Sequence, residues 1–283
     1  MLPSANGESL LIMNGTDNEL SLDERKAALI SLLKRIMTVL DKNGLKYFAY
    51  YGTLLGAVRH QGFIPWDDDI DLGMMRKDYD NLIKIDWEKE GLRLISPQTR
   101  EMSPFSFTKI TDHEHVLEED ISIDNFSMGL NIDIFPIDSL SEKSLLVCER
   151  LVYLLEKLRT VKVIRISQKR SLPKNTIIFL LKITAAFFSF KFLTVNIDRL
   201  SRNIGREELF CGCKCGPYGF REFIEKQNFA DLKYQDFEEL IIPVPSGFDV
   251  ILEAIYGDFM ELPPEEKRIT HHRNKVYRKV LNF

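Results

Sequence analysis

The chain has 283 residues, of which 45% are hydrophobic and 28% are charged, as is ordinary for a globular protein. This length can bury a sizeable core, and it suggests one elaborated domain or two small ones. The net charge of −4 gives no support to a nucleic-acid-binding function, because such proteins usually present a basic surface.

The N-terminal region divides into a polar stretch and a helix. Residues 1–20 are rich in Asn, Ser and Gly, and we expect them to be disordered. They lack a basic start followed by an apolar block, so no secretory signal is visible and we expect a cytoplasmic protein. The sequence Ser21-Leu22-Asp23-Glu24 is a capping-box pattern, which predicts an amphipathic helix that ends at Asn43-Gly44.

An apolar, aromatic run over residues 45–51 predicts a strand that leads into Gly52-Thr53. A glycine and a small hydroxyl residue at a strand end let backbone N–H groups approach a phosphate closely. Residues 53–60 predict a short helix whose N-terminus faces that phosphate.

Four aspartates follow within five positions, in the sequence Asp67-Asp68-Asp69-Ile70-Asp71. In an extended strand Asp67, Asp69 and Asp71 share one face. Three like charges on one face repel one another, and unpaired carboxylates are costly to desolvate. A hard divalent cation, Mg²⁺ or else Mn²⁺, is the simplest compensation. The pattern therefore indicates a metal-dependent phosphoryl or nucleotidyl transfer site.

A Gly-Ser/Thr turn followed by an Asp-x-Asp strand resembles the nucleotidyltransferase fold of the DNA polymerase beta type. The longer string Arg-His-x-Gly-Phe-Ile-Pro-Trp-Asp-Asp-Asp-Ile-Asp, residues 59–71, resembles the LicD family. That family includes bacterial phosphocholine transferases and is related to the animal fukutin-type phosphosugar transferases. The resemblance implies an α+β fold, with a mixed sheet, flanking helices and an added helical region.

The run from Asn131 to Asp138 predicts a neighbouring strand in which Asp133 lies between two isoleucines. It resembles the Val/Ile-Asp-Ile-Phe-Pro motif of the family, in which the aspartate completes the metal site. A strand-end aspartate that faces water is the alternative. Asp138 is expected to be a turn or helix-cap residue.

The region between these motifs predicts a helix over residues 76–88 and strands over residues 92–95 and 105–110. Lys109 lies in the second of these strands. It could reach a phosphate, and a solvated strand lysine is an equal alternative.

Residues 142–201 predict helices, in a basic part followed by an apolar part at residues 177–193. Two lysines, Lys182 and Lys191, argue against a membrane span, because each costs roughly 2.5–3.5 kcal/mol at the centre of a spanning helix. A buried helical hairpin is one interpretation. The other is an interfacial helix whose basic neighbours meet anionic lipid headgroups, a peripheral membrane contact that suits a lipid-linked acceptor.

Three of the four cysteines form the cluster Cys211-Gly212-Cys213-Lys214-Cys215, which fits a reducing compartment better than a disulfide framework. Alternate cysteines on a strand share a face and could bind zinc. Structural zinc sites usually use two separated pairs, however, and this chain has no second pair. We therefore expect small buried side chains instead.

The C-terminal part contains Pro-x-Pro, Tyr-Gly-Asp-Phe-Met, Leu-Pro-Pro, Lys-Arg and His271-His272 in an order similar to that of the LicD family. His271 is either a surface residue or part of a phosphate-facing tail. We expect four regions: a disordered N-terminus (1–20), a nucleotidyltransferase-like core (21–140), a helical insertion (141–206) that faces acceptor or membrane, and a part that completes the catalytic domain (207–283).

Together, the motifs and the resemblance imply a site with defined roles. Metal ligands are Asp69, Asp71 and Asp133, and Asp67 either joins them or acts as a base on an acceptor hydroxyl. The expected substrate-binding residues are Gly52, Thr53, Arg59, Trp66, Lys109 and His271.

The resemblance implies CDP-choline as donor and a cell-surface glycan, of the teichoic acid or lipopolysaccharide type, as acceptor. A choline headgroup would need an aromatic cage, for which Tyr51, Trp66 and Phe63 lie near the motif. The alternatives are another donor, CDP-ribitol or CDP-glycerol, and a non-catalytic nucleotide-binding protein on the same fold. The reaction would take place in the cytoplasm or at the inner face of the cytoplasmic membrane.

Overall fold

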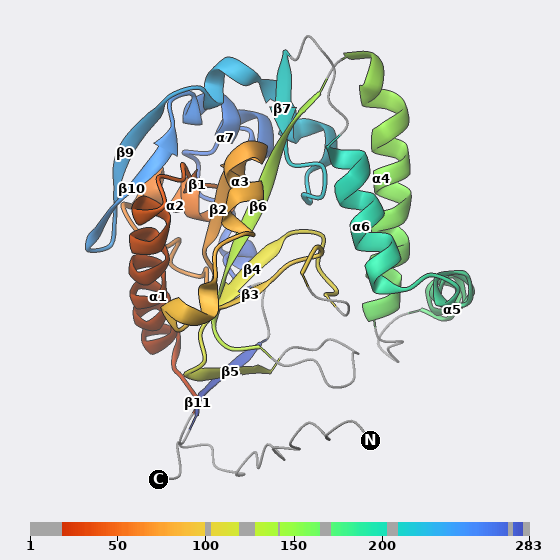
Figure 1. The fold of residues 1–283 in the computed structure, drawn as a ribbon, viewed down its shortest axis with the longest axis horizontal. Coiled ribbons are helices and arrows are strands. Elements are labelled where there is room, and N and C mark those ends of the chain that lie inside the picture. Colours follow the sequence, from red (N-terminus) through yellow and green to blue (C-terminus); the bar gives the residue numbers. More distant parts are fainter. Residues whose placement is uncertain are drawn as a thin grey trace.

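The computed structural model describes residues 19–99, 103–118, 128–140, 142–164, 171–202, 209–270 and 274–279. Its largest sheet has the strand order β1-β2-β6-β4-β3, and β7 and β8 extend it from β6 (Figure 1). The strands of this sheet are β1 (Phe48–Ala49), β2 (Asp71–Met75), β3 (Arg93–Ile95), β4 (Thr108–Thr111), β6 (Asn131–Leu140), β7 (Phe210–Gly212) and β8 (Ile224–Glu225). Strands β2 and β6 are parallel and the other pairs are antiparallel, so the sheet is mixed.

Two small antiparallel pairs and a set of helices complete the described part of the chain. The pairs are β9 (Leu232–Phe237) with β10 (Leu240–Pro245), and β5 (His115–Glu118) with β11 (Lys275–Arg278). The helices are α1 (Leu22–Lys42), α2 (Tyr51–His60), α3 (Arg76–Leu82), α4 (Glu142–Val163), α5 (Leu172–Ala186), α6 (Phe190–Ser201) and α7 (Phe248–Tyr256). The predicted α+β class is confirmed.

The structure confirms the type of most predicted helices and strands, whereas several of their bounds differ. Helix α1 begins with both hydrogen bonds of the Ser21–Glu24 capping box. The predicted helix over residues 53–60 is α2. The strand predicted over residues 45–51 is wrong in extent, because β1 contains only Phe48–Ala49. The helix predicted over residues 76–88 ends at Leu82, and a single 3₁₀ turn, Trp87–Glu90, follows.

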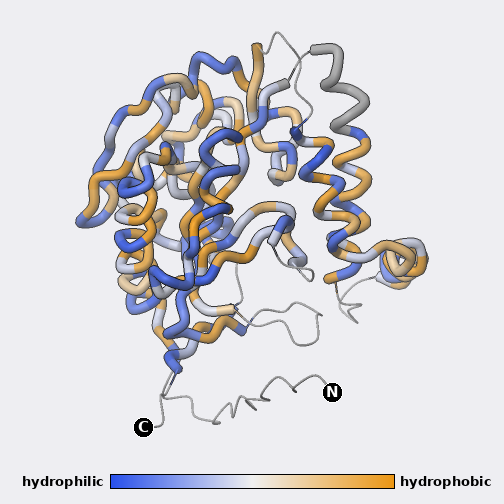
Figure 2. The backbone as a smooth tube through the Cα atoms, in the orientation of Figure 1, coloured by the Kyte–Doolittle hydropathy of each residue, from blue (hydrophilic) through white to orange (hydrophobic). Residues whose placement is uncertain are grey.

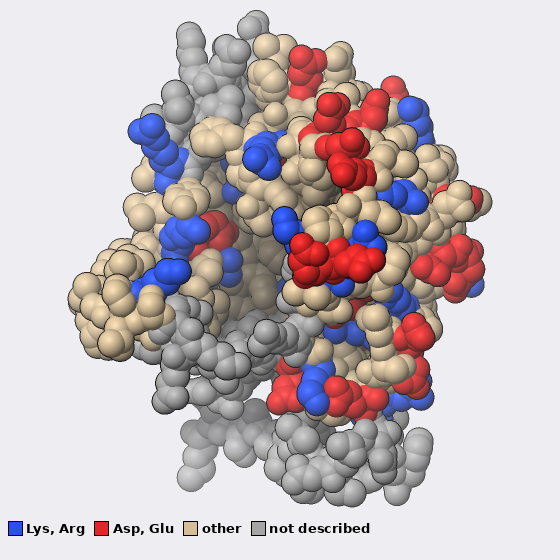
Figure 3. Space-filling model, turned by 180° about the vertical axis from the view of Figure 1, so that it is seen from behind, with Lys and Arg blue, Asp and Glu red and all other residues tan. Residues whose placement is uncertain are grey.

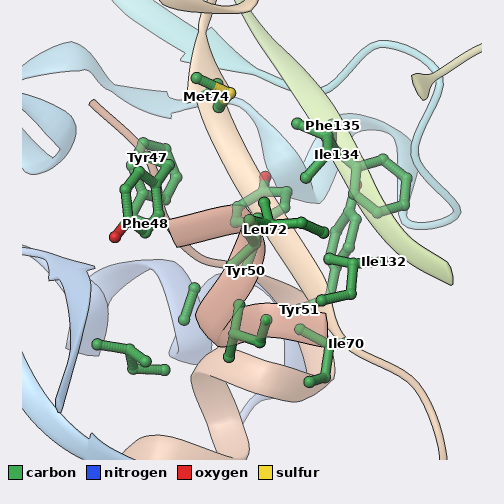
Figure 4. Close-up of a cluster of buried hydrophobic side chains, with 14 of the residues drawn as sticks. Tyr47, Phe48, Tyr50, Tyr51, Ile70, Leu72, Met74, Ile132, Ile134 and Phe135 are labelled. Carbon is green, nitrogen blue, oxygen red and sulfur yellow. The ribbon is translucent and has the colours of Figure 1, made fainter. Parts of the chain in front are cut away.

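The main hydrophobic core lies around the centre of the sheet. The apolar side chains of β2 and β6 are fully buried, Leu72 and Met74 on one strand and Ile132 and Ile134 on the other. Figure 4 shows them gathered beside Tyr50 at the start of α2. Such burial of large apolar side chains on adjacent strands is worth roughly 1.5–3 kcal/mol each. It fixes the strands on which the acidic residues lie.

Helices α4, α5 and α6 form a separate group beside the sheet, at the right of Figure 1. They share a small apolar cluster of Leu158, Ala185 and Leu193. No single helix in the described ranges is long and apolar enough to cross a membrane; α5 and α6 meet that test only as a pair, which is bent by 87°.

An ion-pair network joins this helical group to the sheet. The guanidinium of Arg76 donates two hydrogen bonds of 2.7 Å to Asp138 on β6 and one of 2.8 Å to Asp198 on α6. The expectation that Asp138 is a turn or helix-cap residue is therefore wrong: it lies within β6 and is 2% exposed. Burial alone would lower the pKa of Arg76, but the hydrogen bonds and charges of its carboxylate partners outweigh burial and raise it.

We expect the substitution Arg76→Met to lower the free energy of unfolding by about 3–5 kcal/mol, because it leaves the buried Asp138 carboxylate without its partner. Urea denaturation followed by circular dichroism measures this change. The matched control is Lys42→Met, which breaks the exposed Lys42–Glu90 pair and should cost about 1 kcal/mol or less. Equal losses in the two variants would contradict this account of the network.

Candidate active site

A cavity of about 1240 Å³ lies between the sheet and helix α4. Residues at the start of α2 and at the near ends of β2 and β6 line one side, and residues 153–160 of α4 line another. The segment from Tyr256 to Ile269 lines a third side. In Figure 3 the surface is hollowed beside the helical lobe, and Lys and Arg side chains lie around the hollow.

The register of two parallel strands brings the carboxylates together. Asp71, the first residue of β2, is paired with Asp133, the third residue of β6. Partners in register on adjacent strands point to the same face of a sheet. On the other side of β6, Lys109 of β4 is paired with Asp133, and its Nζ donates to both carboxylate oxygens at 2.6 and 2.8 Å.

The predicted division of the acidic run is confirmed. Asp67, Asp69 and Asp71 all line the cavity, whereas Asp68 turns inward, is 2% exposed and pairs with Arg25 at 2.7 Å. The strand itself begins only at Asp71, so residues 67–70 achieve this alternation without belonging to the sheet.

Several carboxylates lie close together at this point. Burial raises the pKa of the Asp71 carboxyl well above its ordinary value, and the charges of Asp69, Asp133 and Asp67 raise it further. The positive charge of Lys109 lowers the pKa of Asp71. A cation placed in the cavity would therefore stabilise the ionised form of Asp71.

The donor set has the chemistry that Mg²⁺ prefers, since carboxylate oxygens are hard ligands and one or two of them suffice beside water and phosphate. Within the described ranges, however, no group of three or more His, Cys, Asp or Glu side chains is arranged to hold a metal ion. Asp133 has both oxygens bonded to Lys109. The set of Asp69, Asp71 and Asp133 as metal ligands stays a prediction.

The residues at the start of α2 separate into two roles. Gly52 lines the cavity, and a Cβ at this position would lie 2.6 Å from an oxygen of Asp67. Thr53 is buried, and its hydroxyl accepts a 2.8 Å hydrogen bond from the backbone N–H of Asp71. The phosphate-binding role of Thr53 stays a prediction; in the structure its hydroxyl holds the backbone of Asp71.

Helix α2 also begins with unusual backbone geometry. Tyr51 has a φ of +40°, in the left-handed region that is uncommon for a non-glycine residue. No side chain caps the N-terminus of this helix. Because Tyr51 and Gly52 line the cavity, the positive end of the helix dipole faces it.

The other predicted substrate-binding residues have different environments. Arg59 and Trp66 line the cavity, and Arg59 donates to the backbone oxygens of Phe259 at 2.7 Å and Glu261 at 3.3 Å. Lys109 is 7% exposed, pairs with Asp133 and does not belong to the lining, so the structure gives it a positioning role. His271 lies outside the described residues.

Two tyrosines that the motif analysis did not select complete an aromatic wall. Tyr218 lies with its ring centroid 5.7 Å from that of Tyr51 and 5.4 Å from that of Tyr256. All three line the cavity near Asp67 and Asp71. Burial raises the pKa of Tyr256 most, its neighbour Tyr218 adds to the rise, and the charges of Asp71 and Asp67 raise it further. The Tyr-Gly-Asp-Phe-Met block contained Tyr256, but only the fold brings Tyr218 to it.

One of the three aromatic residues near the acidic motif, Phe63, lies outside the cavity. Phe63 is 7% exposed, packs against Phe237 with ring centroids 5.0 Å apart, and does not line the cavity. Tyr51 keeps its place, and its hydroxyl donates to the buried carboxylate of Glu222.

The described cysteines form no disulfide. Cys211 and Cys213 are buried, as expected for small apolar side chains, and Cys215 lies at the edge of the cavity. The sulfur atoms of Cys213 and Cys215 are 3.4 Å apart.

Comparisons with known proteins agree with these motifs. Residues 44–143 match the family model described as LicD/FKTN/FKRP, nucleotidyltransferase domain. The chain is 28% identical over 271 residues to the lipopolysaccharide cholinephosphotransferase LicD of Haemophilus influenzae, a match that covers 92% of this chain and 98% of that protein.

Two shorter matches cover about a fifth of the chain each. The human ribitol 5-phosphate transferase FKRP is 43% identical over 54 residues, or 19% of this chain and 11% of that protein. An uncharacterised protein of Rickettsia typhi is 53% identical over 58 residues, or 20% of this chain and 19% of its own length. The chain thus contains a segment, residues 44–143, that matches the LicD/FKTN/FKRP family model, and over nearly its full length it is similar to a LicD protein.

Proposed function

We propose that the protein is a divalent-cation-dependent transferase that moves phosphocholine from CDP-choline to a hydroxyl group of a cell-surface glycan. The observation that carries this proposal is the placement of Asp67, Asp69 and Asp71 in one cavity, beside the register-paired Asp133 and the N-terminus of α2. LicD family proteins are transferases, and the long match is to a protein named for choline phosphate transfer. We interpret the mixed sheet as a nucleotidyltransferase-like fold.

The carboxylates support a cation-binding role. Asp69 and Asp71 would hold Mg²⁺ or Mn²⁺, and Asp133, held by Lys109, is the third carboxylate of the set. A bound cation would neutralise the diphosphate of the donor as charge moves onto the leaving group. Thr53 holds the backbone of Asp71 in place, and this keeps the Asp71 carboxylate directed into the cavity.

Donor phosphates fit the start of α2. Its uncapped N–H groups and its dipole favour an anion, and the missing side chain of Gly52 leaves the room that the Asp67 carboxylate occupies beside them. Arg59 lies on the next turns of the same helix and adds positive charge to the cavity wall.

The choline headgroup fits the tyrosine wall. A quaternary ammonium is bound by aromatic faces and has no N–H to donate, so rings and nearby carboxylates are the groups that recognise it. Tyr51, Tyr218 and Tyr256 supply the rings, and Asp67 and Asp71 supply negative potential.

The transfer step needs little covalent chemistry from the protein. The acceptor oxygen attacks the phosphorus that carries choline, the bond from that phosphorus to the CMP oxygen breaks, and CMP leaves. Asp67, which lines the cavity but precedes the sheet, is suited to accept the hydroxyl proton. Catalysis is then mostly positioning and charge neutralisation.

A second donor class has a specific observation in its favour. The match to a ribitol 5-phosphate transferase is 43% over 54 residues, so another CDP-alcohol, CDP-ribitol or CDP-glycerol, is the alternative substrate. The carboxylate site serves either donor, because the diphosphate is common to both. The tyrosine wall is the feature that favours choline.

We expect Asp71→Asn to raise the melting temperature of the metal-free protein and to abolish the further rise caused by Mg²⁺. The neutral amide removes a buried charge whose pKa is raised by burial and by three neighbouring carboxylates. Above the pKa of an unfolded aspartate that charge opposes folding, and its cost grows as the pH rises toward the folded pKa. Thermal unfolding at several pH values, with and without Mg²⁺, measures both effects.

The control for this experiment is Asp138→Asn, which also alters a buried carboxylate. It should destabilise the metal-free protein, because Asp138 is paired with Arg76, and it should leave the Mg²⁺ effect intact. Transferase activity with CDP-choline should fall by at least about 100-fold in Asp71→Asn, as expected on loss of a metal ligand. An unchanged Mg²⁺ effect in that variant would refute the metal assignment.

Donor selectivity is tested by Tyr256→Leu. We expect the KM for CDP-choline to rise about tenfold or more, since a desolvated cation–π contact is worth about 2 kcal/mol, while the KM for CDP-ribitol changes little. The matched control is Tyr234→Leu, an exposed tyrosine on β9 that does not line the cavity. A preference for CDP-ribitol in the unmodified protein would overturn the donor and keep the carboxylate chemistry.

A further inference from the structure

Helix α5 exposes an apolar surface that the rest of the described chain does not cover. Its only buried residue is Ala185, one of 15, whereas the 21-residue helix α1 buries seven. The exposed side chains include Leu172 (82%), Ile177 (57%), Phe179 (53%), Leu180 (58%) and Ile183 (48%), with Phe187 (84%) just beyond the helix. Figure 2 shows this helix as a mainly hydrophobic coil at the edge of the molecule.

The charge around this surface has one sign. Residues 157–197, which run from α4 through α5 into α6, contain nine of the chain's 38 basic residues and none of its 42 acidic ones. The net charge of the whole chain is nevertheless −4, so basic character is concentrated in this segment. In Figure 3 the lobe that contains α5 is mainly tan and blue, with a small red area beside the hollow, and most red side chains lie on the opposite side.

We propose that α5 and the phenylalanine-rich turn after it lie in the interfacial layer of an anionic lipid bilayer. Basic residues beside an exposed apolar helix are the pattern that binds such surfaces, because apolar burial and headgroup attraction act together. Phe179, Phe187 and Phe192 are exposed at this surface, and aromatic rings favour the level of the headgroups.

The same observations argue against a second copy of the chain as the occupant. A two-fold interface brings a patch against itself, so Lys174 and Lys182 of α5 would face their own equivalents without an acidic partner from the patch. A membrane-spanning role also fits poorly. Helix α5 has 15 residues, fewer than the roughly 20 that a span requires.

The contacts of α5 place this surface next to the cavity. Helix α5 packs on α4, where Lys162 Nζ donates to Ala185 O at 3.0 Å and Lys182 Nζ donates to Lys162 O at 3.3 Å. Tyr153, Lys157 and Arg159 of α4 line the cavity. Helix α4 thus has the carboxylate site on one side and the bilayer on the other. If the proposed function holds, the acceptor is a glycan carried on a lipid.

Vesicle co-sedimentation without substrates tests the membrane contact by itself. We expect the unmodified protein to bind vesicles of phosphatidylcholine with 30% phosphatidylglycerol at low salt, to bind pure phosphatidylcholine much less, and to be released by high salt. The variant Ile177→Gln/Leu180→Gln should lose about tenfold or more in binding, because two apolar side chains no longer enter the bilayer.

The matched control is Tyr234→Gln/Ile241→Gln, which removes two equally exposed apolar side chains from the β9–β10 pair and should bind as the unmodified protein does. Absence of binding to anionic vesicles, or equal binding by the α5 variant, overturns the proposal. A dimer by sedimentation velocity that the α5 variant alone disrupts also overturns it, in favour of a second copy.

The outcome is distinguishable from that of the proposed function. Transfer to a water-soluble acceptor sugar should survive in the α5 variant, because its substituted residues do not line the cavity. If the protein binds vesicles but has no transferase activity, the proposed function is wrong and the proposed membrane contact stands.

Discussion

The register between two parallel strands is the constraint on which the site depends. Because β2 and β6 pair in parallel, Asp71 and Asp133 lie side by side, and Asp69 and Asp67 lead into the same cavity. Like charges so close are unfavourable, and the neighbouring elements reduce the cost. Lys109 supplies a counter-charge from β4, and the start of α2 turns its positive end toward the cavity. A donor that brings a cation would complete this compensation, so the repulsion that costs stability is also the source of affinity.

Two parts of the fold form walls of the cavity: the central sheet, and the helical group α4–α6 that an ion-pair network joins to it. Asp71 and Asp133 project from strands whose opposite side chains are buried, so the main core sets their positions. Helix α4 belongs to a group with its own small apolar cluster, and the Arg76 network with Asp138 and Asp198 ties that group to the sheet. A buried ion pair adds little stability compared with apolar contacts, but it demands one geometry. Its value here is that it fixes where the wall of α4 stands relative to the carboxylates.

Local sequence patterns predicted what depends on neighbours in the chain. Alternation was enough to separate Asp68 from the three cavity aspartates, and the capping box was enough to start α1. Contacts between distant segments could not be derived in this way: Lys109 meets Asp133 across 24 positions, and Tyr51 meets Glu222 across 171. Asp138 followed a proline, which suggested a turn, and only the pairing of β6 with β7 shows that the strand continues past it. Phe63 is close to the motif in sequence, yet a turn at Pro65-Trp66 separates it from the cavity.

For the helical region α4–α6, the interpretation depends on exposure and charge and not on sequence motifs. It has no string that resembles a catalytic motif, yet α5 combines exposed apolar side chains with basic residues, and α4, on which α5 packs, lines the cavity. An aqueous protein gains nothing by exposing Phe179 and Phe187 to water, and the lysines near them would oppose burial against a like surface. Under the proposed function, a nucleotide-activated donor would come from water and a lipid-linked acceptor from a membrane. A helical group with α4 at the cavity and α5 at the bilayer would then bring both reactants to the same carboxylates.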